Sequence, residues 1–166
     1  MLAFYFAGCL VIWLGILSLR NGLDFASYIR RETTRRRPAF TPFASVIAPN
    51  RGLDQGLREN ITALFNQDYP AYEIVFVTDK DDDPSLALIK EIATSHGSPI
   101  PTRIVIAGEA IDSGQKVHNL RVATSEIDPP SEVFVFVDTD ARPHPGWLKS
   151  LVAPLLDEHL GATTGY

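Results

Sequence analysis

Residues 133–140 read VFVFVDTD, an apolar run that ends in two aspartates, Asp138 and Asp140, one residue apart. An unbroken run of β-branched and aromatic residues is typical of a strand buried on both faces in the middle of a parallel sheet. The two acids then follow the carboxyl end of the strand, where ligands bind in open α/β sheets. Paired carboxylates are suitable ligands for Mg²⁺ or Mn²⁺ and leave positions for phosphate oxygens. The stretch therefore predicts a metal and nucleotide-diphosphate site.

The chain before this stretch repeats one plan of apolar strand, polar loop and amphipathic helix. Pro, Asn, Gly and Asp mark the loops, and apolar residues recur at helical spacing after them. Such alternation predicts an α/β, mostly parallel, Rossmann-like sheet with right-handed crossovers. The expected units are strand 45–48 with a helix capped by Asp54, strand 73–78 with a helix from Pro84, and strand 102–107 with a weaker helix from about Gly114.

The segment after Asp140 predicts a broad apolar helical face over residues 147–156, which Pro154 should kink by removing a backbone hydrogen bond. Residues 161–166 read as the beginning of a further strand. Because the expected strands are short, we expect the fold to be incomplete at the carboxyl end of this sequence.

The first nineteen residues carry no charged side chain and predict a transmembrane helix over residues 1–19. A cleaved signal peptide and a buried soluble helix are the alternatives, but no basic side chain precedes the apolar run. Six arginines against two acids follow by residue 37, so residues 20–43 are expected to form a basic juxtamembrane linker. The positive-inside rule then places the α/β region, residues 44–166, on the cytoplasmic side of the membrane.

The charge pattern and the absence of other motifs exclude several functions. Residues from Pro38 onward hold nine basic and eighteen acidic side chains, which does not fit nucleic acid but leaves the basic segment suited to anionic lipid headgroups. Cys9 is the only cysteine, so a disulfide within the chain is excluded. The glycines and lysine of residues 108–116 do not match a phosphate loop, because Gln115 separates Gly114 from Lys116.

Four segments resemble the nucleotide-binding half of family 2 glycosyltransferases, which are membrane enzymes with a GT-A fold. They are SVIAPN at residues 45–50, FVTD at 76–79, GQKVHNL at 114–120 and FVDTD at 136–140. Within that family, GLD at residues 52–54 and DYPAYE at 68–73 are most similar to ceramide glucosyltransferases. The full D-x-D at residues 138–140 departs from the laxer motif of the ceramide enzymes.

The resemblance implies transfer of a hexose from a nucleotide diphosphate-sugar, with UDP as the expected nucleotide, to a lipid-type acceptor with inversion. It assigns Asp140 and Asp138 to the metal, Mg²⁺ or Mn²⁺, and Asp79, Lys116, Asn119 and Asp138 to the donor nucleotide. From the residues alone, the two acids of the D-x-D could instead cap the following turn, and Lys116 could be an ordinary surface lysine. A lysine in the first turn of a helix would suit a diphosphate, since free N–H groups attract anions there.

The general base that deprotonates the acceptor lies beyond the D-x-D strand in the family, so no catalytic residue is assigned, and we expect this chain alone to be inactive. Two other classes remain as alternatives. A haloacid dehalogenase-type phosphatase also places D-x-D after an apolar strand, although Arg142 stands where that motif has Thr or Val. The other is a non-catalytic membrane-tethered binding module.

Overall fold

The computed structural model describes residues 1–35, 38–97, 100–127 and 131–165, in two compact units, Met1–Pro38 and Ala39–Tyr166. The part of the chain outside these ranges includes Arg36 and Arg37 of the basic segment, residues 128–130 before the D-x-D strand, and Tyr166. Expectations for those residues therefore lie outside the described structure.

The first unit consists of one long helix, α1, over Leu2–Thr34. Within it, Phe4–Glu32 is long and apolar enough to cross a membrane. Its most apolar part is not buried against the rest of the described chain. The helix continues beyond Leu19, so that a large part of the segment expected as a linker is helical. No proline interrupts the sequence before Pro38, which allows the backbone hydrogen bonds to continue.

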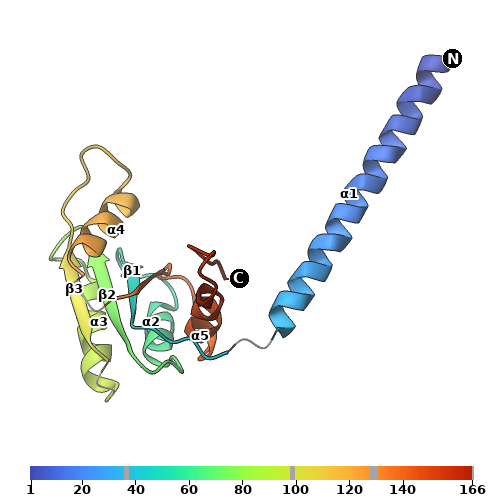
Figure 1. Ribbon diagram of the computed structural model, residues 1–166. Helices are drawn as coiled ribbons and strands as arrows, with labels where there is room; N and C mark the ends of the chain where they lie inside the picture. The colour runs from blue at the N-terminus through green and yellow to red at the C-terminus, as the bar shows by residue number, and fades with distance from the viewer. Residues whose placement is uncertain (36–37, 98–99, 128–130, 166) are drawn as a thin grey trace. The chain divides into compact units, whose positions relative to one another are not determined.

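The second unit is built on a four-stranded parallel sheet in the order β3-β2-β1-β4 (Figure 1). Its strands are β1 (Ala44–Pro49), β2 (Tyr72–Thr78), β3 (Thr102–Ile106) and β4 (Val133–Phe136). Ala44 of β1 is paired with Tyr72 of β2 on one side and with Val133 of β4 on the other. The predicted α/β class and parallel sheet are confirmed.

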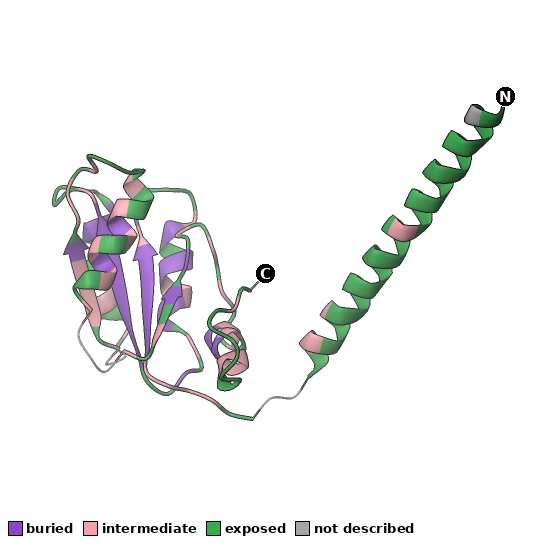
Figure 2. Ribbon diagram, turned by 45° about the horizontal axis from the view of Figure 1, so that its top comes forward, coloured by how far each residue is buried: buried purple, intermediate pink, exposed green. Residues whose placement is uncertain are grey.

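Helices cover the two faces of the sheet unequally. The apolar sides of α2 (Leu57–Phe65), α3 (Ser85–Ser95) and α5 (Trp147–Val152) form the larger core with alternate side chains of β1, β2 and β4. On the opposite face, α4 (Gln115–Ser125) buries Ala123 against Ile47, Val75 and Val77. Strand β2, buried throughout, and β1, buried except at Pro49, lie between these two layers (Figure 2).

The position of β4 differs from the prediction that its strand is buried on both faces. Val135 is buried, but Phe134 and Phe136 on the other face are 46% and 52% exposed. The prediction was wrong because β4 lies at the end of the sheet, where it pairs with β1, and because α4 packs on the other strands. In β4, the valine side chains therefore face the covered side of the sheet and the phenylalanines face the open side.

Local differences concern how the elements begin and end. Asp54 does not cap α2, which begins at Leu57 after Gly56 in the left-handed conformation with φ 80°. The α-helix before Pro154 stops at Val152 and continues as a 3₁₀ helix, η1 (Ala153–Leu156), in line with the predicted interruption. The described residues 161–165 form no strand.

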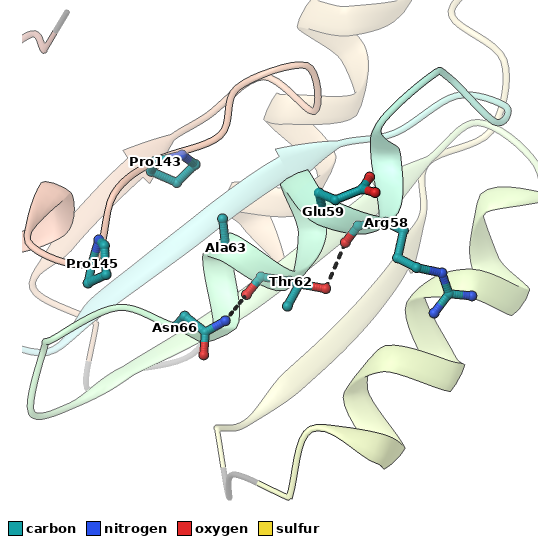
Figure 3. A pocket seen from close by; sticks show the side chains of 7 residues that line it. All are labelled: Arg58, Glu59, Thr62, Ala63, Asn66, Pro143 and Pro145. Carbon is teal, nitrogen blue, oxygen red and sulfur yellow. Dashed lines mark hydrogen bonds between the residues drawn. The ribbon is translucent and has the colours of Figure 1, made fainter.

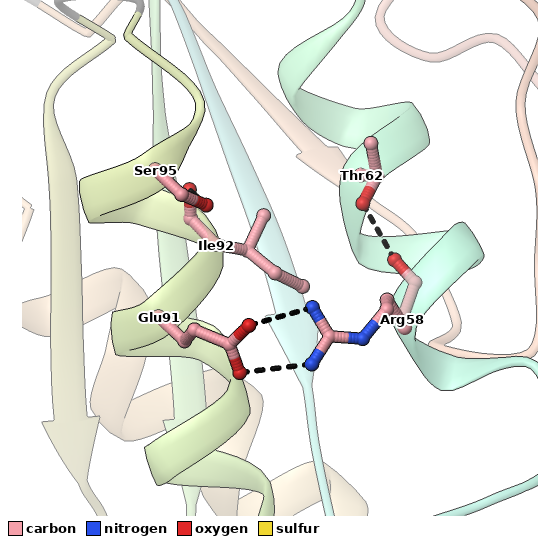
Figure 4. A network of polar contacts seen from close by, with 5 residues as sticks. All are labelled: Arg58, Thr62, Glu91, Ile92 and Ser95. Carbon is pink, nitrogen blue, oxygen red and sulfur yellow. Dashed lines mark hydrogen bonds and ion pairs between the residues drawn. The ribbon is translucent and has the colours of Figure 1, made fainter.

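The two helices α2 and α3 are joined at the surface by a bidentate ion pair. Both terminal nitrogens of Arg58 donate to the carboxylate of Glu91, at 2.9 and 2.8 Å (Figure 4). These hydrogen bonds lower the pKa of Glu91 and raise that of Arg58. Because both groups are solvent-exposed, the pair contributes little to stability.

Phenylalanines on the two faces of the sheet should contribute unequally to the free energy of unfolding. Phe76 is fully buried in the larger core, so Phe76→Ala should lower the free energy of unfolding by about 3–5 kcal/mol. Phe136→Ala removes the same ring from the open face and should change it far less. Urea unfolding of the full chain in detergent, followed by fluorescence, measures both. Equal losses would contradict the exposed position of β4.

Candidate functional site

The carboxyl edge of the sheet brings together the acids that the sequence analysis selected. Asp79 follows β2 directly, and Asp138 follows β4 after Val137, whose N–H donates to the Ile47 carbonyl at 3.1 Å. Since the strands are parallel, both acids lie at the same edge, with β1 between their strands. The chain reverses its strand order between β1 and β4, which is the point where open α/β sheets bind ligands.

Lys116 and Asp138 meet at this edge. The Lys116 ammonium is 2.5 Å from Asp138 Oδ1, and both side chains are more than half exposed. Lys116 is the second residue of α4, so its charge adds to the free N–H groups of the helix's first turn. An exposed ion pair contributes little stability, so an anion can replace Asp138 as the partner of Lys116 at low cost.

The first turn of α4 is attached to the loop after β3. The Gln115 side chain accepts from Ala110 N–H at 2.9 Å and donates to the Gly108 carbonyl and to Asn119 Oδ1, both at 2.7 Å. The sequence analysis used Gln115 as part of the family-like segment 114–120 and as an interruption of a phosphate loop, and missed this role. Asn119, expected to bind the nucleotide, is buried and holds Gln115 in place. Its role toward a nucleotide stays a prediction.

Asp140 lies in an exposed turn after β4. The Ala141 N–H donates to the Asp138 carbonyl at 3.0 Å, so residues 138–141 form a hydrogen-bonded turn that contains both acids of the D-x-D. The side chain of Asn60, from α2, donates to the Thr139 carbonyl in this turn. Neither Asn60 nor Arg142, which bonds to it, was selected from the sequence as a site residue.

Asp83 ties together the loops that follow β1 and β2. Its carboxylate accepts from the Gly52 N–H at 2.9 Å and from the Ser85 N–H and hydroxyl at 2.8 and 2.6 Å. The helix α3 begins at Ser85 rather than at Pro84, and Asp83 accepts from the backbone N–H of that first helical residue. Burial alone would raise the pKa of Asp83, but these hydrogen bonds outweigh it and the pKa is lowered.

At the end of β1, Asn50 has a buried acceptor that no described group satisfies. Its side chain is 2% exposed and donates to the Ala48 carbonyl at 2.8 Å, whereas Oδ1 has no hydrogen-bond partner among the described residues. Buried polar atoms are nearly always paired with protein or water. This edge therefore contains an acceptor that a water or a ligand group could use.

The acidic residues fit a metal that is shared with a ligand rather than one held by protein alone. Among the described residues, no three His, Cys, Asp or Glu side chains gather closely enough to hold an ion. Mg²⁺ sites with substrate phosphates commonly use only one or two carboxylates, the remaining ligands being phosphate oxygens and water. Asp138 and Asp140, exposed in one turn, match that donor set.

Two grooves lie elsewhere on the second unit. One has a volume of about 460 Å³ and is bounded by α2 and the prolines after the D-x-D turn; it is lined by Arg58, Glu59, Thr62, Ala63, Asn66, Pro143 and Pro145 (Figure 3). The other, of about 580 Å³, runs beside β4 and includes Phe134, Phe136 and Trp147. None of the predicted site residues lines either of these two grooves.

Comparison with known proteins matches these observations to one family. The sequence model of glycosyl transferase family 21 matches residues 9–166. Ceramide glucosyltransferase 1 of Caenorhabditis elegans is 28% identical over 118 residues, which are 70% of this chain and 25% of the relative. The chain thus spans about a quarter of that protein's length. The likeness to ceramide glucosyltransferases expected from the sequence is confirmed, with family 21 as the matching family.

Solved structures share the fold. S. aureus TarS superposes with a TM-score of 0.54 and 26% identity, over 72% of this chain and 20% of TarS; a TarS fragment, residues 1–349, was solved with UDP. The mannosyltransferase PcManGT from Pyrobaculum calidifontis, in complex with GDP-Man and Mn²⁺, gives a TM-score of 0.62 at 21% identity, over 89% of this chain and 44% of that one. The expected GT-A fold is confirmed.

The Asp83 contacts predict a pH-dependent contribution to stability. Because the pKa of Asp83 is lower in the folded chain, this contribution is fully present above the unfolded pKa, about 3.9, and is lost as the pH falls through the folded value. Asp83→Ala should lower the free energy of unfolding at pH 7 by about 1–2 kcal/mol. The difference in the free energy of unfolding between Asp83→Ala and the wild type should be smaller at pH 3 than at pH 7.

The exposed neighbour Asp82 provides the control, since Asp82→Ala removes an equal charge from the same loop. Urea unfolding of both variants in detergent at the two pH values makes the comparison. A loss that is equally large for Asp82→Ala would show that loop charge, and not the contacts to Gly52 and Ser85, is responsible.

Proposed function

Because this chain belongs to glycosyl transferase family 21, we propose that the carboxyl edge of its sheet binds the nucleoside diphosphate of a nucleotide-sugar donor. The observation that carries the proposal is the contact of Lys116 with Asp138, beside the turn that holds Asp140. A cation at a helix amino end and two acids in one turn supply the charges that a metal-bound diphosphate requires. Glycosyl transfer, rather than phosphate hydrolysis, is the chemistry of the family.

In this proposal, each site residue contacts a different part of the donor. Lys116 and the first turn of α4 bind the diphosphate, while Asp79, at the end of β2, contacts the base or the ribose. Asp138 contacts the ribose or a metal-bound water, and Asn119, in the next turn of α4, is also proposed to contact the donor nucleotide. Uridine is the proposed base, supported by the family and by the UDP complex of TarS, whereas PcManGT carries GDP-Man.

Asp140, with Asp138, is the proposed holder of Mg²⁺ or Mn²⁺, supported by the exposed D-x-D turn and by the Mn²⁺ in PcManGT. When bound, such an ion neutralises negative charge that develops on the leaving nucleotide. Lys116 adds a fixed positive charge close to the same oxygens, and α4 orients it without reorganisation during the reaction. The transfer itself is proposed to invert the anomeric centre.

For the whole protein we propose a lipid acceptor at a membrane. The ceramide glucosyltransferase relatives support a lipid acceptor, and α1 is long and apolar enough to span a bilayer. Arginines follow the charge-free part of α1, which supports a cytoplasmic position for the α/β unit. Such a position would give the sheet edge access to nucleotide-sugars.

The metal site predicts that UDP binding depends on Asp140. Calorimetric titration of the full chain in detergent should show tighter UDP binding with Mn²⁺ than without it. Asp140→Asn keeps the side chain's size but removes the charge, so it should abolish that gain and leave metal-free binding unchanged. Glu158→Gln, an exposed acid after η1, should behave as wild type. Equal UDP affinity with and without Mn²⁺ in the wild type would contradict the proposal.

The proposed diphosphate contact predicts a separate effect of Lys116. Lys116→Met retains the aliphatic stem and loses the charge, so UDP binding should weaken by about tenfold, as expected for a hydrogen bond to a charged group. Uridine binding should stay the same, since it lacks phosphates. Lys90→Met, on the exposed side of α3, is the matched control. If uridine and UDP weaken equally, Lys116 does not act on the diphosphate.

A further inference from the structure

Asn60 connects α2 to the turn that contains both acids of the D-x-D. Its side chain is 7% exposed, and Nδ2 donates to the Thr139 carbonyl at 3.0 Å. Its Oδ1 accepts from Arg142 Nε, also at 3.0 Å. One buried side chain thus holds the middle of the turn and the residue that follows it.

The chemistry of the two partners fixes the orientation of the Asn60 amide. A backbone carbonyl can only accept a hydrogen bond, and a guanidinium can only donate. The NH₂ group must therefore face Thr139, and the oxygen must face Arg142. Since both ends of the amide are occupied by partners of opposite character, rotation of the side chain by half a turn would break both bonds.

The contact to the Thr139 carbonyl determines how the two acids are presented. The peptide between Thr139 and Asp140 is planar and trans, so its carbonyl and its N–H point in opposite directions. Holding the carbonyl toward α2 fixes the plane of this peptide, which joins the D-x-D acids. The turn is also closed by the bond from Ala141 N–H to the Asp138 carbonyl. Asn60 therefore acts on the relative orientation of Asp138 and Asp140.

Arg142 contacts the beginning of α2, although its side chain is 58% exposed. Its guanidinium lies 3.9 Å from the carboxylate of Glu59, and a Cβ placed on Gly56 would come within 3.2 Å of it. Gly56 also has a positive φ of 80°, which disfavours any side chain. The beginning of α2 is thus shaped to receive Arg142, which in turn holds the oxygen of Asn60.

We propose that Asn60 is a positioning residue for the metal site, an inference that rests on the proposed function of the D-x-D turn. It orients Asp138 and Asp140 before the donor binds. The turn is then already ordered, so binding does not cost the conformational entropy of ordering it. Outer contacts of this kind typically change metal affinity by about 10–100-fold when they are removed. Asn60 touches neither metal nor donor in this arrangement and acts through the turn.

Asn60→Asp tests the proposal with little change in size. The substitution keeps an acceptor for Arg142, removes the donor to Thr139, and places an oxygen against the carbonyl. Two quantities are measured on the full chain in detergent: the gain in UDP affinity caused by Mn²⁺, by calorimetry, and the hydrogen exchange of the Ala141 amide without any ligand, by NMR. Asn66→Asp is the control, since Asn66, the C-cap residue of α2, also donates to a carbonyl, that of Thr62.

The expected result is a roughly tenfold smaller Mn²⁺-dependent gain with metal-free UDP affinity unchanged, and about fivefold faster exchange at Ala141. Amides of β1 and β2 should exchange as in wild type, which shows that the sheet is intact. Equal losses of UDP affinity with and without Mn²⁺ would overturn the positioning role, as would unchanged exchange at Ala141. A wild type without any Mn²⁺-dependent gain would refute the proposed function, and the exchange result alone would then decide the role of Asn60.

Discussion

The pairing of β1 with a parallel strand on each side is the constraint on which the site depends. Hydrogen bonds to β2 and to β4 fix the ends of three strands relative to one another, and therefore the positions of Asn50, Asp79 and Asp138. The connections leave from one face before β3 and return on the other, so α4 presents Lys116 to the same edge from the opposite layer. Lys116 and Asp138 contact one another because the backbone pairing brings their loops together.

Much of this arrangement was accessible from the sequence because it depends on local patterns. Runs of apolar residues located the strands, helical spacing located the helices, and the order of elements implied that Asp79 and Asp138 share an edge. The position of β4 at the end of the sheet was not predicted. A continuous apolar run is found both in central strands and in end strands with one open face, so the sequence does not separate the two cases. Only the partner helix decides the difference, and α4 covers β1, β2 and β3.

The supporting residues could not be predicted for a related reason. Asp83 reaches Gly52 and Asn60 reaches Thr139 across segments that the sequence keeps apart, and Gln115 reaches back along its own loop to Gly108. Asn, Gln and Asp are common in loops and on helices, and nothing in their spacing indicates a distant backbone partner. The acids that would contact a ligand follow strands directly, whereas the residues that hold those acids are known only once the fold is formed.

The ion pair between Lys116 and Asp138 has a consequence for how metal and nucleotide would bind together. In the proposed donor complex, Lys116 turns to the diphosphate and Asp138 to the metal side, so both partners are exchanged together. A nucleotide that arrived without its cation would leave Asp138 without its lysine, and a cation alone would leave Lys116 without its acid, but both side chains are more than half exposed, so solvent screens most of either cost. In the proposed donor complex, metal and nucleotide together would replace the partner that each side chain loses, which favours their joint binding only weakly.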